Sequence, residues 1–186
     1  MSFDLMRDGR VYRLHTINPD RVDMLADALF SERFVKGQGA LGAVVGDVTS
    51  MCCLGVGCTI ARVAGLYLPL GTMNSSDPDR MLVTYDSAFA YMPERVKSWY
   101  GFTSENPLIP LLKPEYDGMG NVTDHTLVWY NAGMVNDLGV NGITNDGNGG
   151  PEDSFLPTIA PAFRRLAKLA REYQANMSTV AAGQNA

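Results

Sequence analysis

The sequence predicts a single α+β domain, mainly helical, with a small β-hairpin or sheet. Two segments, 19–31 and 159–173, place apolar residues at the three- and four-residue spacing of one helix face. Between them, the glycine-rich stretch 36–47 has the composition of a turn followed by a short hairpin. Hydrophobic residues make up 46% of the 186 residues, which suffices for one ordinary core. We expect one globular domain over 1–175 and a disordered tail over 176–186.

The first helix is expected over Pro19 to Ser31. Asn18 supplies a side-chain cap, and the φ of proline at the next position is already close to the helical value. Val22, Leu25 and Leu29 then recur on one face. Capping and periodicity therefore agree on this element.

A second, buried helix is expected within Met51 to Gly65. The segment is apolar, and its length and Ala-rich second half favour a helix over a strand. Gly55 and Gly57 oppose this assignment, since each costs about 1 kcal/mol relative to Ala inside a helix. We interpret these glycines as permitting close packing against another backbone.

Proline and glycine mark most of the remaining boundaries. Met92-Pro93 opens a third helix, and Gly101 is placed to end it. The prolines from Pro107 to Pro114 bias the residues before them toward an extended connector. The other assignments are a strand at Thr126–Tyr130, an exposed loop at Gly71–Arg80 and a long irregular loop at Asn136–Asp153.

The last helix is expected to be amphipathic and basic, from Ile159 to Tyr173, with Pro161 in its first turn or at a kink. One side of this helix carries a run of basic residues. Such a run is usually a solvated face, although it could contact an acidic partner. The run consists of Arg164, Arg165, Lys168 and Arg171.

Charge and hydropathy exclude several functional classes. The net charge of -5 provides no overall basic field for nucleic-acid phosphates or anionic lipid. The first ten residues lack an apolar signal region, and no segment approaches the roughly 20 apolar residues of a membrane span. We expect a soluble, cytoplasmic protein that binds neither nucleic acid nor membrane.

Several motifs resemble an uncharacterised family of small tailed-phage proteins, especially those of actinobacteriophages. FVKGQGAL at 34–41 and MCCLGVGCTIA at 51–61 match its Gly-Gln-Gly-x-Leu turn and its Cys-Cys-Leu-Gly-Val-x-Cys helix. MPERVKSWYGF at 92–102 and SENPLI at 104–109 resemble the Pro-x-x-Val-x-x-Trp helix and Asn-Pro segment that follow. The resemblance spans roughly 22–173.

Near the C-terminus, Asn145-Asp146-Gly147 and SFLPTIA at 154–160 are similar to the Asn-Asp and Ser-Phe-x-x-Ile-Ala segments of that family. The chain departs from the pattern at Gly57, where a larger apolar residue is usual, and at Thr59, where an acid is common. It also carries an insertion over 131–150. These departures bear on a shared ligand site more than on the fold.

The resemblance implies a biological setting and no reaction, because the family has no established activity. In that setting the protein is a bacteriophage accessory protein in the host cytoplasm, acting in host takeover or anti-defence. Our leading hypothesis is non-enzymatic binding of a host protein or sequestration of a small ligand, without a cofactor. A structural virion or assembly component is one alternative.

The three cysteines allow a second alternative, a cysteine-dependent hydrolase. Cys52 or Cys53 near a helix start would be the nucleophile, with His125 as the base. Against this, a buried thiol is commonly a core residue, and His125 is equally consistent with a solvated position. The spacing of Cys58 from the others places no two thiols on one helix face for zinc, so we predict no metal site.

Candidate ligand-binding residues are Lys36, Gln38 and Trp99. Lys36-Gly37-Gln38-Gly39 offers backbone N–H groups and an ammonium to a phosphate, but it lacks the full phosphate-loop spacing. A helix-terminating turn is the simpler interpretation. The acidic loop Asp146–Asp153 lacks the final glutamate of an EF-hand, so it is expected to be a solvated turn.

Overall fold

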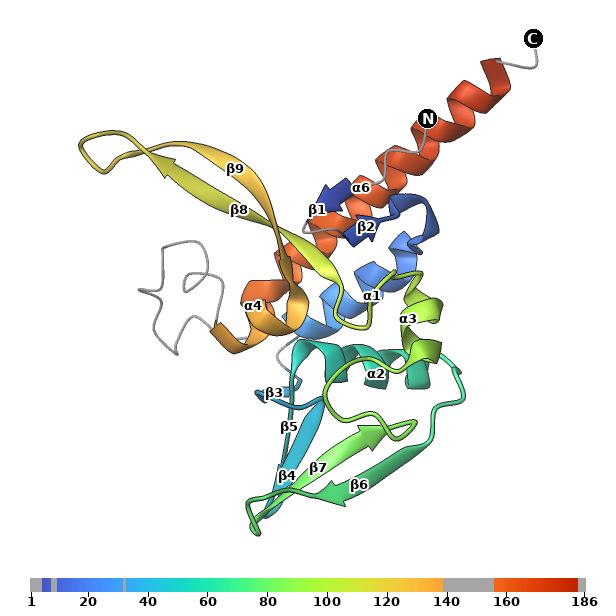
Figure 1. Cartoon of the computed structure of the whole chain (residues 1–186), viewed down its shortest axis with the longest axis vertical. Coiled ribbons are helices and arrows are strands. Elements are labelled where there is room, and N and C mark those ends of the chain that lie inside the picture. The colour runs from blue at the N-terminus through green and yellow to red at the C-terminus, as the bar shows by residue number, and fades with distance from the viewer. Residues whose placement is uncertain (1–4, 8–9, 32, 139–155, 184–186) are drawn as a thin grey trace.

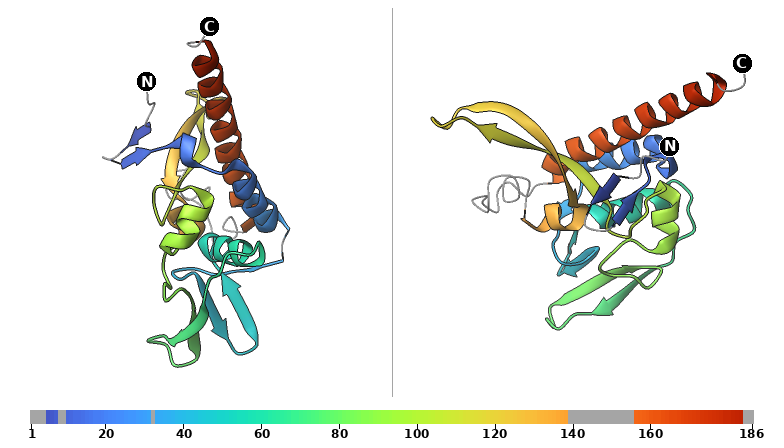
Figure 2. Two further views of the ribbon diagram at one scale, coloured as in Figure 1. Left: turned by 90° about the vertical axis from the view of Figure 1, so that its right-hand side faces the viewer. Right: turned by 45° about the horizontal axis from the view of Figure 1, so that its top comes forward.

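The fold is α+β and layered (Figure 1). A computed structural model describes residues 5–7, 10–31, 33–138 and 156–183. A five-stranded sheet packs against helix α2 (Cys53–Val63), and α1 (Pro19–Phe30) and α6 (Leu156–Gly183) lie beyond α2. Two turned views show the same arrangement (Figure 2). The sheet and two further hairpins make the predicted description "mainly helical" too strong.

One cluster of buried apolar side chains runs through these layers. It extends in sequence from Leu14 to Ala170 and includes both sides of α2. Burial of such side chains supplies the main driving force for folding. Within the described residues, no helix has the length and apolar character needed to cross a membrane.

Helix α1 begins and ends close to its predicted bounds. The Oδ1 atom of Asn18 accepts a hydrogen bond from the Arg21 amide at 3.1 Å, which confirms the predicted cap. Val22, Leu25 and Leu29 are fully buried against the core. The local signals of this segment therefore determine both its start and its orientation.

Two arginines on the basic side of α6 form exposed ion pairs with α1, while Lys168 pairs with Glu172 on α6 itself. Arg164 lies 2.7 Å from Asp27, and Arg171 lies 2.6 Å from Asp23. Arg165 is half-buried, and its Nε donates to the Pro110 carbonyl. Exposed ion pairs of this kind contribute about 0–1 kcal/mol each, so they orient the helix pair more than they stabilise it.

Helix α6 is longer than predicted. It continues to Gly183, so residues 176–183 are helical where we expected a disordered tail. Gln174 ties the helix to the N-terminal segment, because its Nε2 donates to the Ile17 carbonyl at 2.8 Å. Pro161 lies inside the helix, beyond the first turn. No local pattern predicts the Gln174 contact, because it joins residues far apart in the chain.

The central sheet contains the predicted hairpin. Its strands, in the order β3-β5-β4-β7-β6, are β3 (Val35–Lys36), β4 (Gly42–Val45), β5 (Val48–Met51), β6 (Leu70–Asn74) and β7 (Arg80–Tyr85). β4 and β5 are antiparallel and joined by Gly46-Asp47, at the end of the glycine-rich stretch, with Gly46 at φ +56. β3 adds a short parallel edge.

The prediction of an exposed loop over Gly71–Arg80 is wrong at both ends. Residues 71–74 belong to β6 and Arg80 begins β7, so only 75–79 form the turn. All five β6 residues are exposed, so the segment lacks the alternation of buried and exposed residues by which a strand is recognised. Pairing with β7, and not local propensity, holds β6 in place.

Helix α2 lies between the sheet and α1 (Figure 1), and seven of its 11 residues are buried. Its N-cap is Cys52, whose Sγ accepts a hydrogen bond from the Gly55 amide at 3.4 Å. A Cβ atom at Gly55 would lie 1.7 Å from the Leu41 carbonyl oxygen. The predicted close backbone approach is thus confirmed at Gly55.

Helix α3 (Glu94–Tyr100) matches the third predicted helix, with Pro93 at the N-cap position. Gly101 ends it in the left-handed conformation, at φ +76. The Asn18 amide donates to the Tyr100 carbonyl at 2.9 Å, so the end of α3 joins the start of α1. A short 3₁₀ turn, η1 (Leu14–Thr16), precedes α1.

A long hairpin projects from the body of the protein (Figure 1). It pairs β8 (Leu108–Tyr116) with β9 (Val122–Asn131), so the predicted extended connector and the predicted strand are partners. Ile109, Leu111 and Trp129 anchor its base in the core. A second, shorter hairpin pairs β1 (Leu5–Arg7) with β2 (Arg10–Tyr12).

Helix α4 (Ala132–Leu138) follows β9 directly. The irregular loop predicted from Asn136 to Asp153 is therefore wrong for 136–138, and the rest of it lies outside the described residues. Asn136 is disfavoured inside helices, but here its side chain is fully buried and hydrogen-bonded. Tertiary contacts override local propensity at this position.

Candidate ligand-binding pocket

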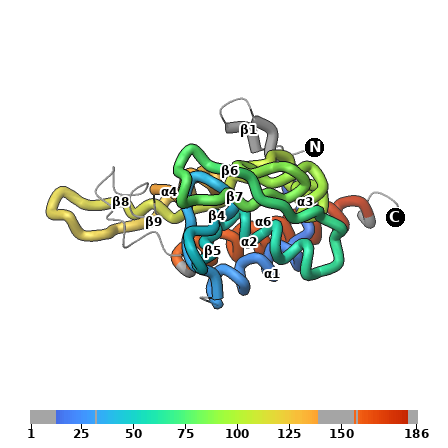
Figure 3. Tube along the Cα trace, turned by 90° about the horizontal axis from the view of Figure 1, so that it is seen from below, coloured from blue at the N-terminus to red at the C-terminus, as the bar shows by residue number. Residues whose placement is uncertain are grey.

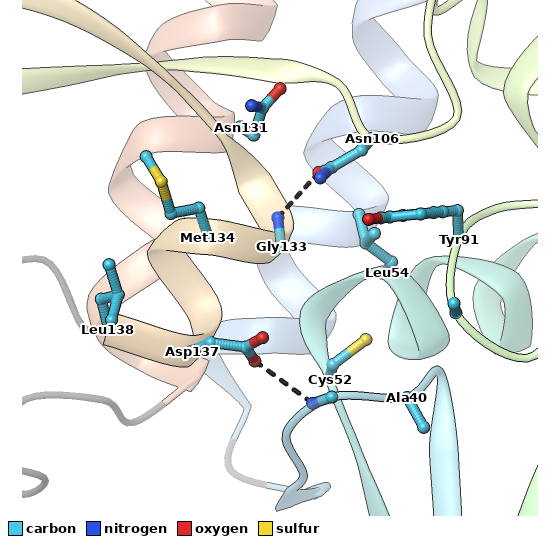
Figure 4. A pocket seen from close by; sticks show the side chains of 12 residues that line it. Ala40, Cys52, Leu54, Tyr91, Asn106, Asn131, Gly133, Met134, Asp137 and Leu138 are labelled. Atoms are coloured by element: carbon cyan, nitrogen blue, oxygen red, sulfur yellow. Dashed lines mark hydrogen bonds between the residues drawn. The ribbon is translucent and has the colours of Figure 1, made fainter.

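A pocket of about 550 Å³ lies where the loop after β3, the N-terminus of α2 and helix α4 meet (Figure 4). Its walls are largely apolar and include Ala40, Leu54, Met134 and Leu138. The volume falls in the range of sites for small ligands, about 300–1,000 Å³. The pocket is partly open to solvent, so a ligand or a protruding side chain can enter it.

Four polar side chains, Tyr91, Asn106, Asn131 and Asp137, also line the pocket (Figure 4). Asn106 Oδ1 accepts from the Gly133 amide at 2.8 Å, which leaves its Nδ2 without a partner in the described part of the chain. Asp137 uses Oδ1 for contacts within the protein, and its Oδ2 has no partner there. Donor and acceptor groups are therefore available to a ligand.

The buried side chain of Asn136 joins the three segments around the pocket. Its Oδ1 accepts from the Cys53 amide at 2.9 Å, at the N-terminus of α2. Its Nδ2 donates to the Gly37 carbonyl at 2.9 Å and to Asp137 Oδ1 at 3.0 Å. The amide thus fixes α2, α4 and the glycine-rich loop relative to one another.

The glycine-rich loop makes two further contacts with α4. Gln38 Nε2 donates to the Asp137 carbonyl at 3.0 Å, and the Gly39 amide donates to Asp137 Oδ1 at 3.4 Å. Gln38, a predicted ligand-binding residue, therefore links the loop to the helix. Its neighbour Gly39 lines the pocket in its place.

Asn136 and Asp137 were missed in the sequence. The resemblance to phage proteins places the Asn-Asp segment at Asn145-Asp146, which lies outside the described residues. The pair that contacts the Gly-Gln-Gly loop is Asn136-Asp137. The second Asn-Asp pair in the chain was the available signal, and only the fold shows which pair reaches the loop.

Lys36 and Trp99, the other predicted ligand-binding residues, lie apart. Trp99 stacks on Arg21 of α1, with the guanidinium carbon 4.4 Å from the ring centre. Lys36 is on β3, and its Nζ is shielded from solvent without a hydrogen-bond partner among the described residues. Burial lowers the pKa of Lys36, while the carboxylate of Asp137 opposes this change. The structure does not bring Trp99 to the loop.

Replacing Lys36 by Met should stabilise the protein at neutral pH. The charged amine is disfavoured in the fold, so the penalty is full below its lowered folded pKa and is relieved as pH rises toward its unfolded value of 10.5. We expect the urea midpoint of K36M to exceed that of wild type by roughly 0.2–0.5 M at pH 7. The difference should shrink by pH 10; a constant difference would contradict this account.

The three cysteines are buried and free. Burial raises the pKa of the Cys52 thiol to about 11 and raises the pKa values of Cys53 and Cys58. Cys53 donates to the Ala132 carbonyl at 3.5 Å, as a core thiol does. His125 is exposed on the projecting part of β9, away from α2 (Figure 1). The structure therefore does not unite the predicted nucleophile with its base.

Native protein should resist thiol alkylation. Because Cys52 titrates near pH 11 and not 9.0, its thiolate fraction at pH 7 is about a hundredfold lower than that of the unperturbed group. We expect iodoacetamide to leave all three thiols unmodified until urea unfolds the chain, as followed site by site by mass spectrometry. Rapid modification of Cys52 in folded protein would refute this expectation.

Metal binding finds no support in the described residues, which contain no cluster of three or more His, Cys, Asp or Glu side chains. The acidic loop Asp146–Asp153 lies outside them. The pocket itself has one carboxylate, Asp137, and one thiol, Cys52. This donor set is smaller than the four ligands of a structural zinc site.

Comparison with known proteins identified no relative. No family model matches the chain, and no curated protein or solved structure is significantly similar to it. The resemblance to phage proteins therefore stays a prediction based on the motifs.

Proposed function

We propose that the protein acts by binding, as a phage accessory protein in the host cell, and that the pocket beside α2 and α4 takes a small ligand or a side chain of a host protein. The main support is the convergence of separate motif segments on one open pocket. Gly39, Cys52 and Asn106 come from three motifs that are distant in sequence, and all line it. The buried amide of Asn136 bonds to Gly37 and Cys53, which belong to the same segments as Gly39 and Cys52.

The pocket favours a neutral or cationic ligand that donates hydrogen bonds. Among the described residues, Asp137 is the only charged one that lines it, and one of its carboxylate oxygens has no partner there. A phosphate would approach this carboxylate without a facing cation, since Lys36 does not line the pocket. An amine, a guanidinium or a planar amide-bearing ring fits the charge and the apolar walls.

Catalysis by a cysteine is the less supported function. Cys52 lines the pocket at the N-terminus of α2, but burial raises its pKa and no histidine lies among the residues that line the pocket. A nucleophilic thiol needs a lowered pKa or an adjacent base. A structural role in the virion is supported by no specific feature of the described fold.

A pair of matched substitutions tests the binding function. Met134 and Met177 are both half-exposed helical methionines, but only Met134 lines the pocket. We expect Met134→Trp to fill the pocket and Met177→Trp to leave it open. The three proteins are equilibrated with actinobacterial cell extract and recovered, and bound small molecules and proteins are quantified by mass spectrometry.

Binding supports the proposal if a component is retained by wild type and Met177→Trp and is reduced at least tenfold on Met134→Trp. Equal urea midpoints for the two variants would show that the loss is local. Retention of the same components by all three proteins would contradict the proposal, as would retention of none.

A further inference from the structure

A second cavity lies on the other side of α2, against the central sheet. It has a volume of about 460 Å³ and is bounded by the second half of α2 and by β4, β5, β6 and β7. Figure 3 shows these strands lying over α2. The Gly-Gln-Gly loop and α4 do not contribute to it, so it is distinct from the pocket described above.

The polar groups at the base of this cavity are already paired. The Tyr85 hydroxyl lies 2.7 Å from Thr59 Oγ1, which also lies 3.1 Å from the Gly55 carbonyl. A chain of donors from Tyr85 through Thr59 to Gly55 satisfies all three groups. The cavity wall above them is apolar and includes Val44 and Val83. This part of the cavity suits an apolar group.

The charge at this cavity is positive. Arg62 is the only ionisable residue lining it apart from Tyr85, and no ion pair joins Arg62 to an acid in the described part of the chain. The guanidinium is near enough to Tyr85 to lower the pKa of its hydroxyl, against the larger effect of burial. Thr49 and Thr72 add hydroxyls that have no protein partner among the described contacts. An anion at the rim would therefore meet a cation and hydroxyl donors.

We propose that this cavity binds a small amphiphilic carboxylate, with its apolar body between α2 and the sheet and its carboxylate on Arg62. Guanidinium and carboxylate form paired hydrogen bonds of matching geometry. The site extends the account beyond the proposed function, because it uses a different cavity and a ligand of opposite charge preference. Whether this cavity binds a ligand does not depend on whether the pocket at α4 binds one.

The test uses octanoate as the probe and octylammonium as its counterpart of opposite charge. Each is titrated into ¹⁵N-labelled full-length protein, and amide shifts are followed by NMR. We expect saturable shifts with octanoate at Val44, Thr72 and Val83, and none with octylammonium. Arg62→Gln should weaken octanoate binding at least tenfold, with Arg62→Lys between Gln and wild type.

Neighbouring residues on the edge strand provide a matched control. Thr72 lines the cavity, whereas Met73 points to the other face of β6 because side chains alternate along a strand. Thr72→Trp should abolish octanoate binding and Met73→Trp should preserve it. Equal binding of octylammonium, equal affinity in Arg62→Gln, or loss of binding in both tryptophan variants would overturn the proposal. So would a dimer, seen by sedimentation without ligand, whose dissociation on dilution shifts the same amides.

Discussion

Gly55→Ala is expected to remove at least about 3 kcal/mol of folding free energy, a large part of the roughly 5–15 kcal/mol that stabilises a typical domain. The added Cβ would lie 1.7 Å from the Leu41 carbonyl oxygen, and this atom is backbone. The same oxygen accepts a hydrogen bond from the Cys52 amide at 3.2 Å. Leu41 cannot move aside without breaking the junction between β4 and α2.

Gly57→Ala provides the control on the same helix. Its Cβ would meet the terminal methyl of Met92 at 2.6 Å, and that methyl ends a flexible side chain. Both substitutions gain the same intrinsic helix propensity, about 1 kcal/mol. We expect Gly57→Ala to stay within about 1 kcal/mol of wild type in urea unfolding followed by circular dichroism. Similar losses in both variants would show that α2 and Leu41 are not in contact.

Asn136→Ala should destabilise the protein by about 2–4 kcal/mol, because removing the amide leaves two backbone groups without a partner. The Cys53 amide at the start of α2 loses its acceptor, and the Gly37 carbonyl loses its donor. Asn136 is fully buried, so water does not replace these contacts directly. The loss is measured as a shift of the urea midpoint.

Asn106→Ala is the control, because it removes an amide that is less buried than that of Asn136 and that accepts a single hydrogen bond. Asn106 is partly exposed and accepts one hydrogen bond, from the Gly133 amide. Its removal should cost about 1 kcal/mol. If Asn136→Ala costs no more than Asn106→Ala, the amide of Asn136 does not organise the pocket.

The elements that were predictable have local causes. The side-chain cap of Asn18 and the apolar face of α1 lie within the helix itself, and Gly101 ends α3 because of its own backbone conformation. The turn at Gly46-Asp47 likewise sets the β4–β5 hairpin. β6 lacked such a signal, since all its residues are exposed and its partner strand determines it.

The pocket could be predicted only in part, for a similar reason. The sequence singled out the Gly-Gln-Gly loop and the cysteines, and of these Gly39 and Cys52 line the pocket. It did not identify Asn136 or Asp137, whose partners Gly37 and Gln38 lie 99 residues away in the chain. Contacts at that separation have no local pattern, so a polar residue in α4 resembles a loop residue until the fold is known.

Methyl NMR of methionine tests ligand binding at the α4 pocket most directly. Met134 lines that pocket, Met51 lines the cavity on the sheet, and Met177 lines neither. Protein labelled with ¹³C at the methionine methyl groups is titrated with whole actinobacterial extract and, separately, with its low-molecular-mass fraction. The account predicts a saturable shift of the Met134 methyl, with Met177 unchanged and the shift absent in Asp137→Asn. A Met134 methyl that does not respond, while the extract shifts methionines elsewhere, would contradict it.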